Sequence, residues 1–162
     1  MGSTLTVDNI VGATTAANVK LPAGSVLQVV EGSKTAVYAS TSTSFNNTGV
    51  EVTITPKYSS SKILISVTLN GVYRATTSDY IVLHIYKNDS NHHSFTTNSG
   101  QNSDIDSESV ATCYLDSPST TSATKYSVYQ RSGNGGNCGI NMYGVGGAGS
   151  TRSTITLTEI SV

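Results

Sequence analysis

An all-β fold, an antiparallel β-sandwich, is what this sequence predicts, and three observations support that prediction. The 162 residues include 25 Ser and 23 Thr, with few runs of the Leu, Glu and Lys that favour helices. Thr, Val, Ile and Tyr fit a pleated surface, whereas clusters of Ser, Asn and Gly favour turns. Hydrophobic residues make up 36% of the chain and alternate with polar ones in short runs, which is typical of half-buried strands rather than of disorder.

The chain divides into a short N-terminal segment and one larger domain. Residues 1–22 alternate briefly and are then small and polar, so they predict a connector. Residues 23–162 have the length of one domain, and a chain of this size buries about 70% of the surface that it exposes when unfolded. The first predicted strand of this domain is Val26–Val30, which lies between Ala23-Gly24 and Gly32.

Two strongly alternating strands come next. Gly49 to Thr55 places Val, Val and Ile side chains on one face and polar side chains on the other, and Pro56 ends the strand. Lys62 to Asn70 has the same pattern with four apolar side chains on one face, and it is the strongest strand prediction in the sequence. Asn70-Gly71 then predicts either a type I′ turn or a bulge.

The segment from Tyr80 to Lys87 predicts a strand with an aromatic second face. Its Ile and Leu side chains point inward at alternate positions, which leaves Tyr80, His84 and Tyr86 on the opposite side. Residues 88–91 are dense in turn formers, so residues 92–97 are expected to return as the partner strand of a hairpin.

Further strands are predicted at 110–115, 125–131 and 138–143. The last run, 152–162, has Ile155 and Leu157 on one face but Ile160 on the other, which predicts a bulge or burial on both faces. About eight to ten short strands at regular spacing indicate a β-sandwich, of jelly-roll type.

Composition argues against several functional classes. Charged residues make up 12% of the chain, the formal net charge is −1, and the nine Lys and Arg are scattered, so no nucleic-acid-binding surface is predicted. No apolar run approaches the roughly 20 residues that span a bilayer, which predicts no membrane insertion. No secretory signal is recognisable, which fits either a sequence that begins late or a protein assembled in the cytosol.

Motifs of catalysis and cofactor binding were not recognised either. The sequence has no G-x-S-x-G, H-E-x-x-H or Walker pattern, so we expect neither an enzyme nor a bound cofactor. Cys113 and Cys138 lack metal-site spacing and predict two buried thiols, with a single bridge between neighbouring strands as the alternative.

Five segments carry a resemblance of composition and position to one class of protein: Ser3–Gly12, Leu21–Val30, Ile63–Val72, Ile85–Asn88 and Thr154–Ile160. They resemble the C-terminal parts of tail-fibre and related structural proteins of marine tailed phages, cyanophages especially, and the likeness covers most of the chain. Residues 88–109 and 133–150 contain loops that lie outside the resemblance.

The resemblance implies a fold, an assembly and a place of action. It implies a homotrimer with a β-sandwich tip, in which residues 1–22 connect to a fibre shaft or form a trimerisation segment. The expected function is attachment of a phage tail fibre to a glycan or outer-membrane receptor on a bacterial host. The expected partners are further copies of this chain and other virion tail proteins, and the expected location is the virion, after assembly in the host cytoplasm.

Candidate receptor-binding residues come from the turn at 88–91, the strands beside it and the tyrosines. A tyrosine has an apolar ring and a polar tip, which suits stacking on a sugar while hydrogen bonding to its hydroxyls. The seven tyrosines at 73, 80, 86, 114, 126, 129 and 143 are the candidates of this type, and we expect about half of them to be structural. The predicted receptor-binding residues are Tyr86, Asn88, Asp89, Asn91, His92, His93 and Tyr143.

Two weak metal sites can be considered. Asp104, Asp106 and Glu108 alternate in a loop and could begin a Ca²⁺ site, but a full site needs roughly six to eight oxygen ligands, so a solvated loop is the favoured interpretation. His92 or His93 could converge with its copies on a three-fold axis and bind a transition metal. Because adjacent strand residues point to opposite faces, only one of the two could do so, and an exposed polar hairpin is favoured.

Two rival functions stay open at this point. The chain could be a purely structural virion component, such as a fibre shaft segment, a baseplate piece or a capsid decoration, that binds no receptor. It could also be a depolymerase-type tailspike that uses the acidic loop, although one short loop seldom presents two acids across a sugar.

Overall fold

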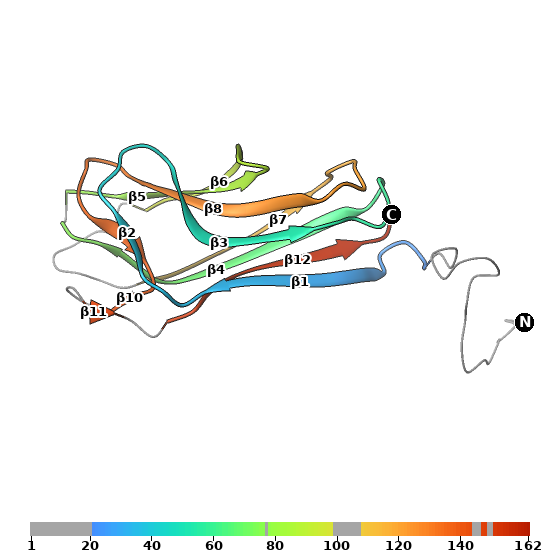
Figure 1. Cartoon of the computed structure of the whole chain (residues 1–162), viewed down its shortest axis with the longest axis horizontal. Helices are drawn as coiled ribbons and strands as arrows, with labels where there is room; N and C mark the ends of the chain where they lie inside the picture. The colour runs from blue at the N-terminus through green and yellow to red at the C-terminus, as the bar shows by residue number, and fades with distance from the viewer. Residues whose placement is uncertain (1–20, 77, 99–107, 144–146, 149–150) are drawn as a thin grey trace, which may run out of the picture.

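A computed structural model of the chain describes residues 21–76, 78–98, 108–143, 147–148 and 151–162, and in this part of the chain every regular element is a strand. The strands form two facing layers, with β1, β12 and β4 in one and β3, β8 and β5 in the other (Figure 1). The predicted all-β, sandwich-like fold is therefore confirmed. No helix long and apolar enough to cross a membrane occurs among the described residues.

We call the first layer sheet I. Its main strands lie in the order β1-β12-β4-β7, every neighbouring pair is antiparallel, and the far end of β4 continues through β9 to β2. The bounds of these strands are β1 Val26–Lys34, β2 Tyr38–Ser40, β4 Lys62–Arg74, β7 Glu108–Asp116, β9 Cys138–Ile140 and β12 Ser153–Ile160.

We call the second layer sheet II, and it is antiparallel in the order β3-β8-β5-β6. The bounds of its strands are β3 Asn46–Ile54, β5 Ile81–Lys87, β6 Ser90–Asn98 and β8 Thr124–Ser132. A separate short ribbon pairs β10 (Met142–Tyr143) with β11 (Gly147–Ala148).

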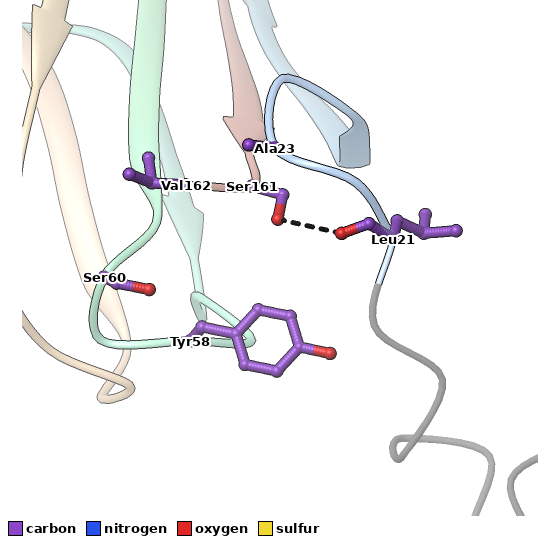
Figure 2. A pocket seen from close by; sticks show the side chains of 6 residues that line it. All are labelled: Leu21, Ala23, Tyr58, Ser60, Ser161 and Val162. Carbon is purple, nitrogen blue, oxygen red and sulfur yellow. Dashed lines mark hydrogen bonds between the residues drawn. The ribbon is translucent and has the colours of Figure 1, made fainter.

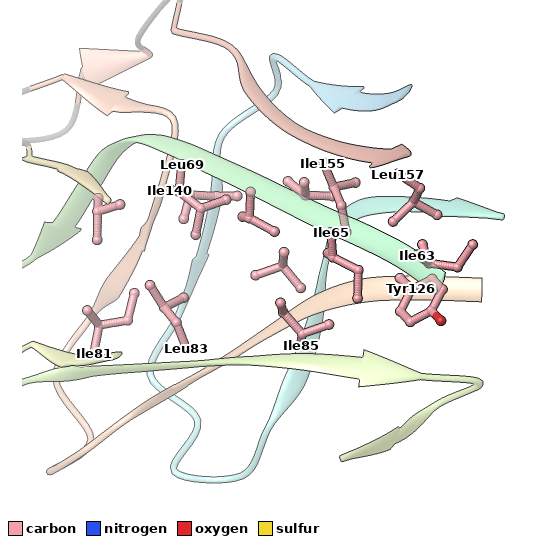
Figure 3. Packing of buried hydrophobic residues seen from close by; sticks show 14 of the residues in the cluster. Ile63, Ile65, Leu69, Ile81, Leu83, Ile85, Tyr126, Ile140, Ile155 and Leu157 are labelled. Atoms are coloured by element: carbon pink, nitrogen blue, oxygen red, sulfur yellow. The ribbon is translucent and has the colours of Figure 1, made fainter. Parts of the chain in front are cut away.

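The core lies between the two sheets and follows from the alternation in the sequence. Every second side chain of β4, β5 and β12 points inward, and these side chains interdigitate across the two layers (Figure 3). The fully buried members include Ile65, Leu83, Ile85 and Leu157. The strands predicted at 49–55, 62–70, 80–87 and 92–97 are thus confirmed, each with bounds that differ by a few residues.

Asn70-Gly71 forms a bulge and not a turn. The pairing of β4 with β7 shifts between Leu69 and Val72, and β4 continues to Arg74. Gly71 has φ +58, and a Cβ atom there would lie 2.3 Å from the carbonyl oxygen of Met142. Glycine is therefore required both by the backbone conformation and by the close approach of β10.

The β5–β6 hairpin has a two-residue turn. Asn88 and Asp89 have φ values of 48° and 61°, and Lys87 pairs with Ser90 on either side of them. Positive φ at both central positions is the requirement of a type I′ turn, and Asn and Asp tolerate it better than most residues.

The C-terminal part differs from the prediction in two places. The strand predicted at 138–143 is broken at Asn141, which has φ 59 and separates β9 from β10. The last strand, β12, keeps an unbroken register with β4, so Ile160 lies on the outer face of sheet I, opposite to Leu157. The change of phase in the sequence thus reflects apolar residues on both faces of one regular strand.

Candidate functional site

Four rings gather on the outer face of sheet II, and we call them the aromatic face: Phe45, His84, Tyr86 and Tyr129. His84 and Tyr86 are alternate residues of β5, so they share the face opposite to the core. Tyr129 of β8 pairs directly with His84, and Phe45 comes from the residue before β3. The predicted aromatic second face is confirmed for His84 and Tyr86, whereas Tyr80 precedes β5 and its ring lies against Gly133.

The rings are in contact with one another. Tyr86 and Tyr129 are stacked, with ring centroids 3.8 Å apart and planes 13° from parallel. Phe45 lies 4.3 Å from His84 and 5.9 Å from Tyr86 between ring centroids. The guanidinium of Arg131 lies 5.5 Å from the Phe45 centroid, close enough for a cation–π interaction. The result is a cluster of contacting, half-buried rings on the outer side of sheet II.

Polar groups surround this surface. The Tyr129 hydroxyl donates a hydrogen bond of 3.1 Å to Oδ1 of Asp89, which also pairs with Nζ of Lys125 at 2.8 Å. His84 Nδ1 lies 3.0 Å from Oδ1 of Asn91. Carboxylate, amide and ammonium groups thus border the rings at the β5–β6 end of the face, where they can exchange hydrogen bonds with a ligand.

Charge at this face follows from these contacts. Burial lowers the pKa of His84 below its ordinary value of 6.5, and the nearby charge of Arg131 lowers it further, against the opposing hydrogen bond from Asn91. The hydrogen bonds from Lys125 and Tyr129 lower the pKa of Asp89. At neutral pH the face therefore carries a neutral imidazole beside a paired carboxylate.

The structure brings together three of the seven predicted receptor-binding residues. Tyr86 belongs to the aromatic face, and Asp89 and Asn91 lie at its border. Asn88 instead holds the turn, because its Oδ1 accepts a 2.9 Å hydrogen bond from the amide of Lys125. Tyr143 lies in β10, and its side chain is outside the described part of the structure.

His92 and His93 lie elsewhere, on the side of β6 that faces β7. His93 stacks on Tyr114 at 4.3 Å between ring centroids, and His92 meets the same ring edge-on at 5.4 Å. The expectation that these neighbours point to opposite faces is wrong, because the β5–β6 pairing shifts between Ile85 and Tyr86 and a bulge turns both rings toward β7. They are half-buried and do not form an exposed polar hairpin.

Two of the candidate tyrosines are part of the core, and some residues of the aromatic face were not among the predicted binding residues. Tyr73 and Tyr126 are buried, which agrees with the expectation that part of the tyrosine set is structural. Phe45 and Arg131 were not predicted as binding residues, and Tyr129 was one of the seven candidate tyrosines but not one of the predicted receptor-binding residues. The signal for Tyr129 and Arg131 was the alternation of Tyr and Arg on the polar face of β8, whereas Phe45 has no periodic signal because it precedes its strand.

Only some of the predicted metal-binding residues lie in the described part of the structure. Asp104 and Asp106 lie outside the described residues, and Glu108 is exposed at the start of β7. His92 Nε2 lies 3.3 Å from Oδ1 of Asp116, within ion-pair distance but not in hydrogen-bonding geometry. Among the described residues no three His, Cys, Asp or Glu side chains form a group that could hold a metal ion.

The two cysteines are free thiols in different environments. Cys138 is buried, as predicted, and burial raises the pKa of its thiol to about 11. Cys113 is exposed on the outer face of sheet I, where it is opposite to Ser66, so the prediction of a second buried thiol is wrong.

A small hollow lies at the end of the sandwich that carries the C-terminus (Figure 2). Its volume is about 120 Å³, and its lining includes Leu21, Tyr58 and Val162. The Ser161 hydroxyl donates to the carbonyl of Leu21 across one side of it. Sites for drug-sized ligands typically have about 300–1,000 Å³, so the aromatic face is the stronger candidate site.

Acid is expected to destabilise the fold. Burial raises the pKa values of Asp79, Asp116 and Glu159, but hydrogen bonds to each carboxylate outweigh it, so all three lie below their ordinary values of 3.8, 3.8 and 4.5. The pKa of His84 is also lowered, from 6.5. The unfolded chain therefore takes up protons that the folded chain does not, and stability is lost as the pH falls.

The loss should begin below about pH 6.5, from His84, and steepen below about pH 4.5, from the three carboxylates. Urea unfolding midpoints measured from pH 8 down to about pH 4 check this. A midpoint that is unchanged or higher at the acid end would contradict it.

No protein family model matches the sequence, and no curated protein matches it at a significant level. The interpretation of the aromatic face therefore depends on its own geometry.

Proposed function

We propose that this chain is the attachment domain of a phage tail fibre and that the aromatic face of sheet II binds a glycan on the surface of a bacterial host. The observation that carries the proposal is the row of contacting rings formed by Phe45, His84, Tyr86 and Tyr129, bordered by hydrogen-bonding groups. Aromatic rings offer flat apolar surface to the C–H faces of a sugar. The bordering groups then select among its hydroxyls.

The scaffold of the face favours binding by a surface that is already in place. Three of the four rings come from the paired strands β5 and β8 and not from loops. Tyr129 is further fixed by its hydrogen bond to Asp89 and its stack on Tyr86. Little side-chain freedom is lost when a ligand binds such groups, which leaves more of the contact energy for affinity.

We also propose that the β-sandwich has jelly-roll topology, and the order of its strands supports this. If the eight long strands are numbered along the chain, sheet I has the order 1-8-3-6 and sheet II the order 2-7-4-5. This alternation of strands between two four-stranded sheets is the arrangement of two Greek keys.

The proposed assembly is a homotrimer that is attached to other tail proteins of the virion and assembled in the host cytoplasm. A trimer would present three aromatic faces, and linked binding can exceed a single affinity by about 10²–10⁴ without new contacts. The proposed function needs neither catalysis nor a cofactor, because attachment depends on geometry and on the number of sites.

Alanine substitution of the stacked tyrosines tests the function. Tyr86→Ala and Tyr129→Ala should each lower affinity for the best ligand on an array of bacterial surface oligosaccharides by at least about tenfold, or about 1.4 kcal/mol. Tyr58→Ala, at the hollow near the C-terminus, is the matched control and should bind like the wild type. Single-site affinities measured by calorimetry separate this effect from multivalency.

Two outcomes would contradict the proposal. Wild-type protein that binds neither the array nor intact bacteria would favour the purely structural virion component. Released oligosaccharide after incubation with bacterial capsule would instead favour a depolymerase.

A further inference from the structure

We infer that the outer face of sheet I, formed by β1, β12, β4 and β7, is covered by a second copy of this chain. This inference deepens the assembly part of the proposed function, because it assigns the surface through which the copies meet. We call this surface the contact face.

An apolar row crosses the contact face at right angles to its strands. Backbone pairing places Val29, Thr158, Leu64 and Leu115 side by side on four consecutive strands. Val29 is 57% exposed and Leu115 is 46% exposed. Between them lie Thr158, which adds a methyl group, and Leu64, which is half-buried. Apolar groups that gather on one face indicate an interaction surface, whereas scattered ones do not.

A second apolar pair extends the row toward the chain termini. Val26 pairs with Ile160 on the same face, and Val26 is 55% exposed. The Ile160 side chain is the reason why β12 is apolar on both sides. A strand gains from apolar residues on both faces only when both faces are covered, and among the described residues only one face of β12 has a cover.

Charge on the contact face favours a second copy as the occupant. Glu31 forms an ion pair with Arg152, so these two charges compensate each other within one chain. Lys62 lies at one end of β4, Asn70 and the exposed Glu108 lie near its other end, and the outward residues between them are apolar or carry hydroxyl, thiol or methyl groups. Copies of this face can therefore pack against one another around a three-fold axis without strong like-charge repulsion, whereas a strongly charged partner would find no complement.

The size and flatness of the face suit such a contact. Most of the remaining outward side chains of β12 and β4 are short, with Thr154, Thr156, Ser66 and Thr68 among them. Four strands about 4.8 Å apart and about eight residues long cover a flat area of roughly 500 Å². Because side chains project from the sheet, the accessible surface is larger than this flat area and approaches the roughly 800 Å² per partner of a standard interface.

The arrangement also has a consequence for binding. The contact face and the aromatic face lie on opposite outer sides of the sandwich. Copies that meet through sheet I would therefore each leave the aromatic face of sheet II turned outward. Self-association through this surface thus increases the number of glycan sites without covering any of them.

Lysine substitutions test the contact face. Wild-type protein at concentrations well above micromolar should sediment at a multiple of the 16.8 kDa monomer mass. Val29→Lys and Leu115→Lys should each return it to 16.8 kDa, because they place a charge at one or the other end of the row, where its exposed apolar side chains lie. Val37→Lys is the matched control, since Val37 is 37% exposed in the turn between β1 and β2 and should leave the assembly intact.

A native thiol provides a second readout that needs no substitution. Cys113 is exposed in the single chain and shares the contact face with Leu115, whereas Cys138 is buried. Maleimide should therefore label Cys113 at least about tenfold more slowly in assembled wild-type protein than in a folded Val29→Lys monomer or in wild-type protein at high dilution.

The outcomes separate this inference from glycan binding. Two results would overturn the inference. One is a monomeric wild-type protein, which would leave the contact face to bind a different protein. The other is a wild-type assembly in which Cys113 is labelled as fast as in a monomer and in which the Val29→Lys variant keeps the mass of the assembly. Single-site binding of the array-selected oligosaccharide by the monomeric variant should equal that of the wild type. Its loss in a folded monomer would count against the aromatic face and not against the contact face.

Discussion

Asp116→Ala is expected to lower the free energy of unfolding by about 3 kcal/mol. Oδ2 of Asp116 accepts hydrogen bonds from the Tyr126 hydroxyl at 2.5 Å and from Nζ of Lys87 at 2.8 Å. Tyr126 is fully buried, so its hydroxyl would lose the acceptor without gaining water. The ammonium of Lys87 is largely shielded as well and would be left without its counter-charge.

A double-mutant cycle with Tyr126→Phe isolates the hydrogen bond. Tyr126→Phe alone should cost about 1 kcal/mol, because the carboxylate keeps Lys87. The double variant should be less destabilised than the sum of the two single variants by at least about 0.5 kcal/mol. Urea denaturation measures all three, and strictly additive losses would show that the two side chains do not interact as described.

Gly32→Ala is expected to destabilise the sandwich by about 3 kcal/mol through a steric clash. Gly32 points inward from β1 opposite Ile155, and a Cβ atom there would lie 2.0 Å from the backbone carbonyl oxygen of Glu51 in β3. Backbone atoms cannot yield as a flexible side chain can, so β1 and β3 would have to separate at this edge. The stabilising entropy of a glycine-to-alanine change, about 0.4–1 kcal/mol, is too small to offset this.

Ser33→Ala is the matched control for this substitution. Ser33 is the next residue of the same strand, but it is exposed on the outer face of sheet I, so its replacement should change stability by less than about 0.5 kcal/mol. Thermal unfolding followed by circular dichroism compares the two variants. Equal melting temperatures for Gly32→Ala and the wild type would mean that β1 and β3 are not as close as the structure places them.

The strands could be predicted because burial of one face imposes a period of two on the sequence. The alternation at Lys62–Asn70 and Tyr80–Lys87 located β4 and β5 and assigned their inner faces correctly. Alternation within a strand does not show which other strand it pairs with. β12, for example, pairs with residues of β1 and β4 that are more than 80 residues away in the sequence. Short strands such as β2 (Tyr38–Ser40) have too few residues to show a period.

The candidate site was predictable only where it lies on a periodic strand. Tyr86 was found because it shares a face with His84, and Asp89 and Asn91 because the turn between β5 and β6 has a recognisable composition. Tyr129 was one of seven tyrosines, and only the β8–β5 register brings it onto Tyr86. The histidines were misplaced because a bulge in β6 leaves no mark in the local sequence.

Buried polar residues were missed for a related reason. Asp116 reads as the first residue of a turn, and Glu159 interrupts an otherwise regular run of Thr and apolar residues. Glu159 is fully buried and accepts hydrogen bonds from Gln28 and from the amide of Lys57. Its partners are about 100 residues or more away in sequence, so only the folded chain shows why a carboxylate can stand there.

The most direct test of the central claim is a crystal structure of the protein with the oligosaccharide that the array selects. The account predicts a sugar ring in van der Waals contact with Tyr86 or Tyr129, with hydroxyls hydrogen bonded to Asp89 or Asn91. A sugar bound on the outer face of sheet I or in the hollow lined by Leu21 and Tyr58, with the aromatic face left bare, would contradict it.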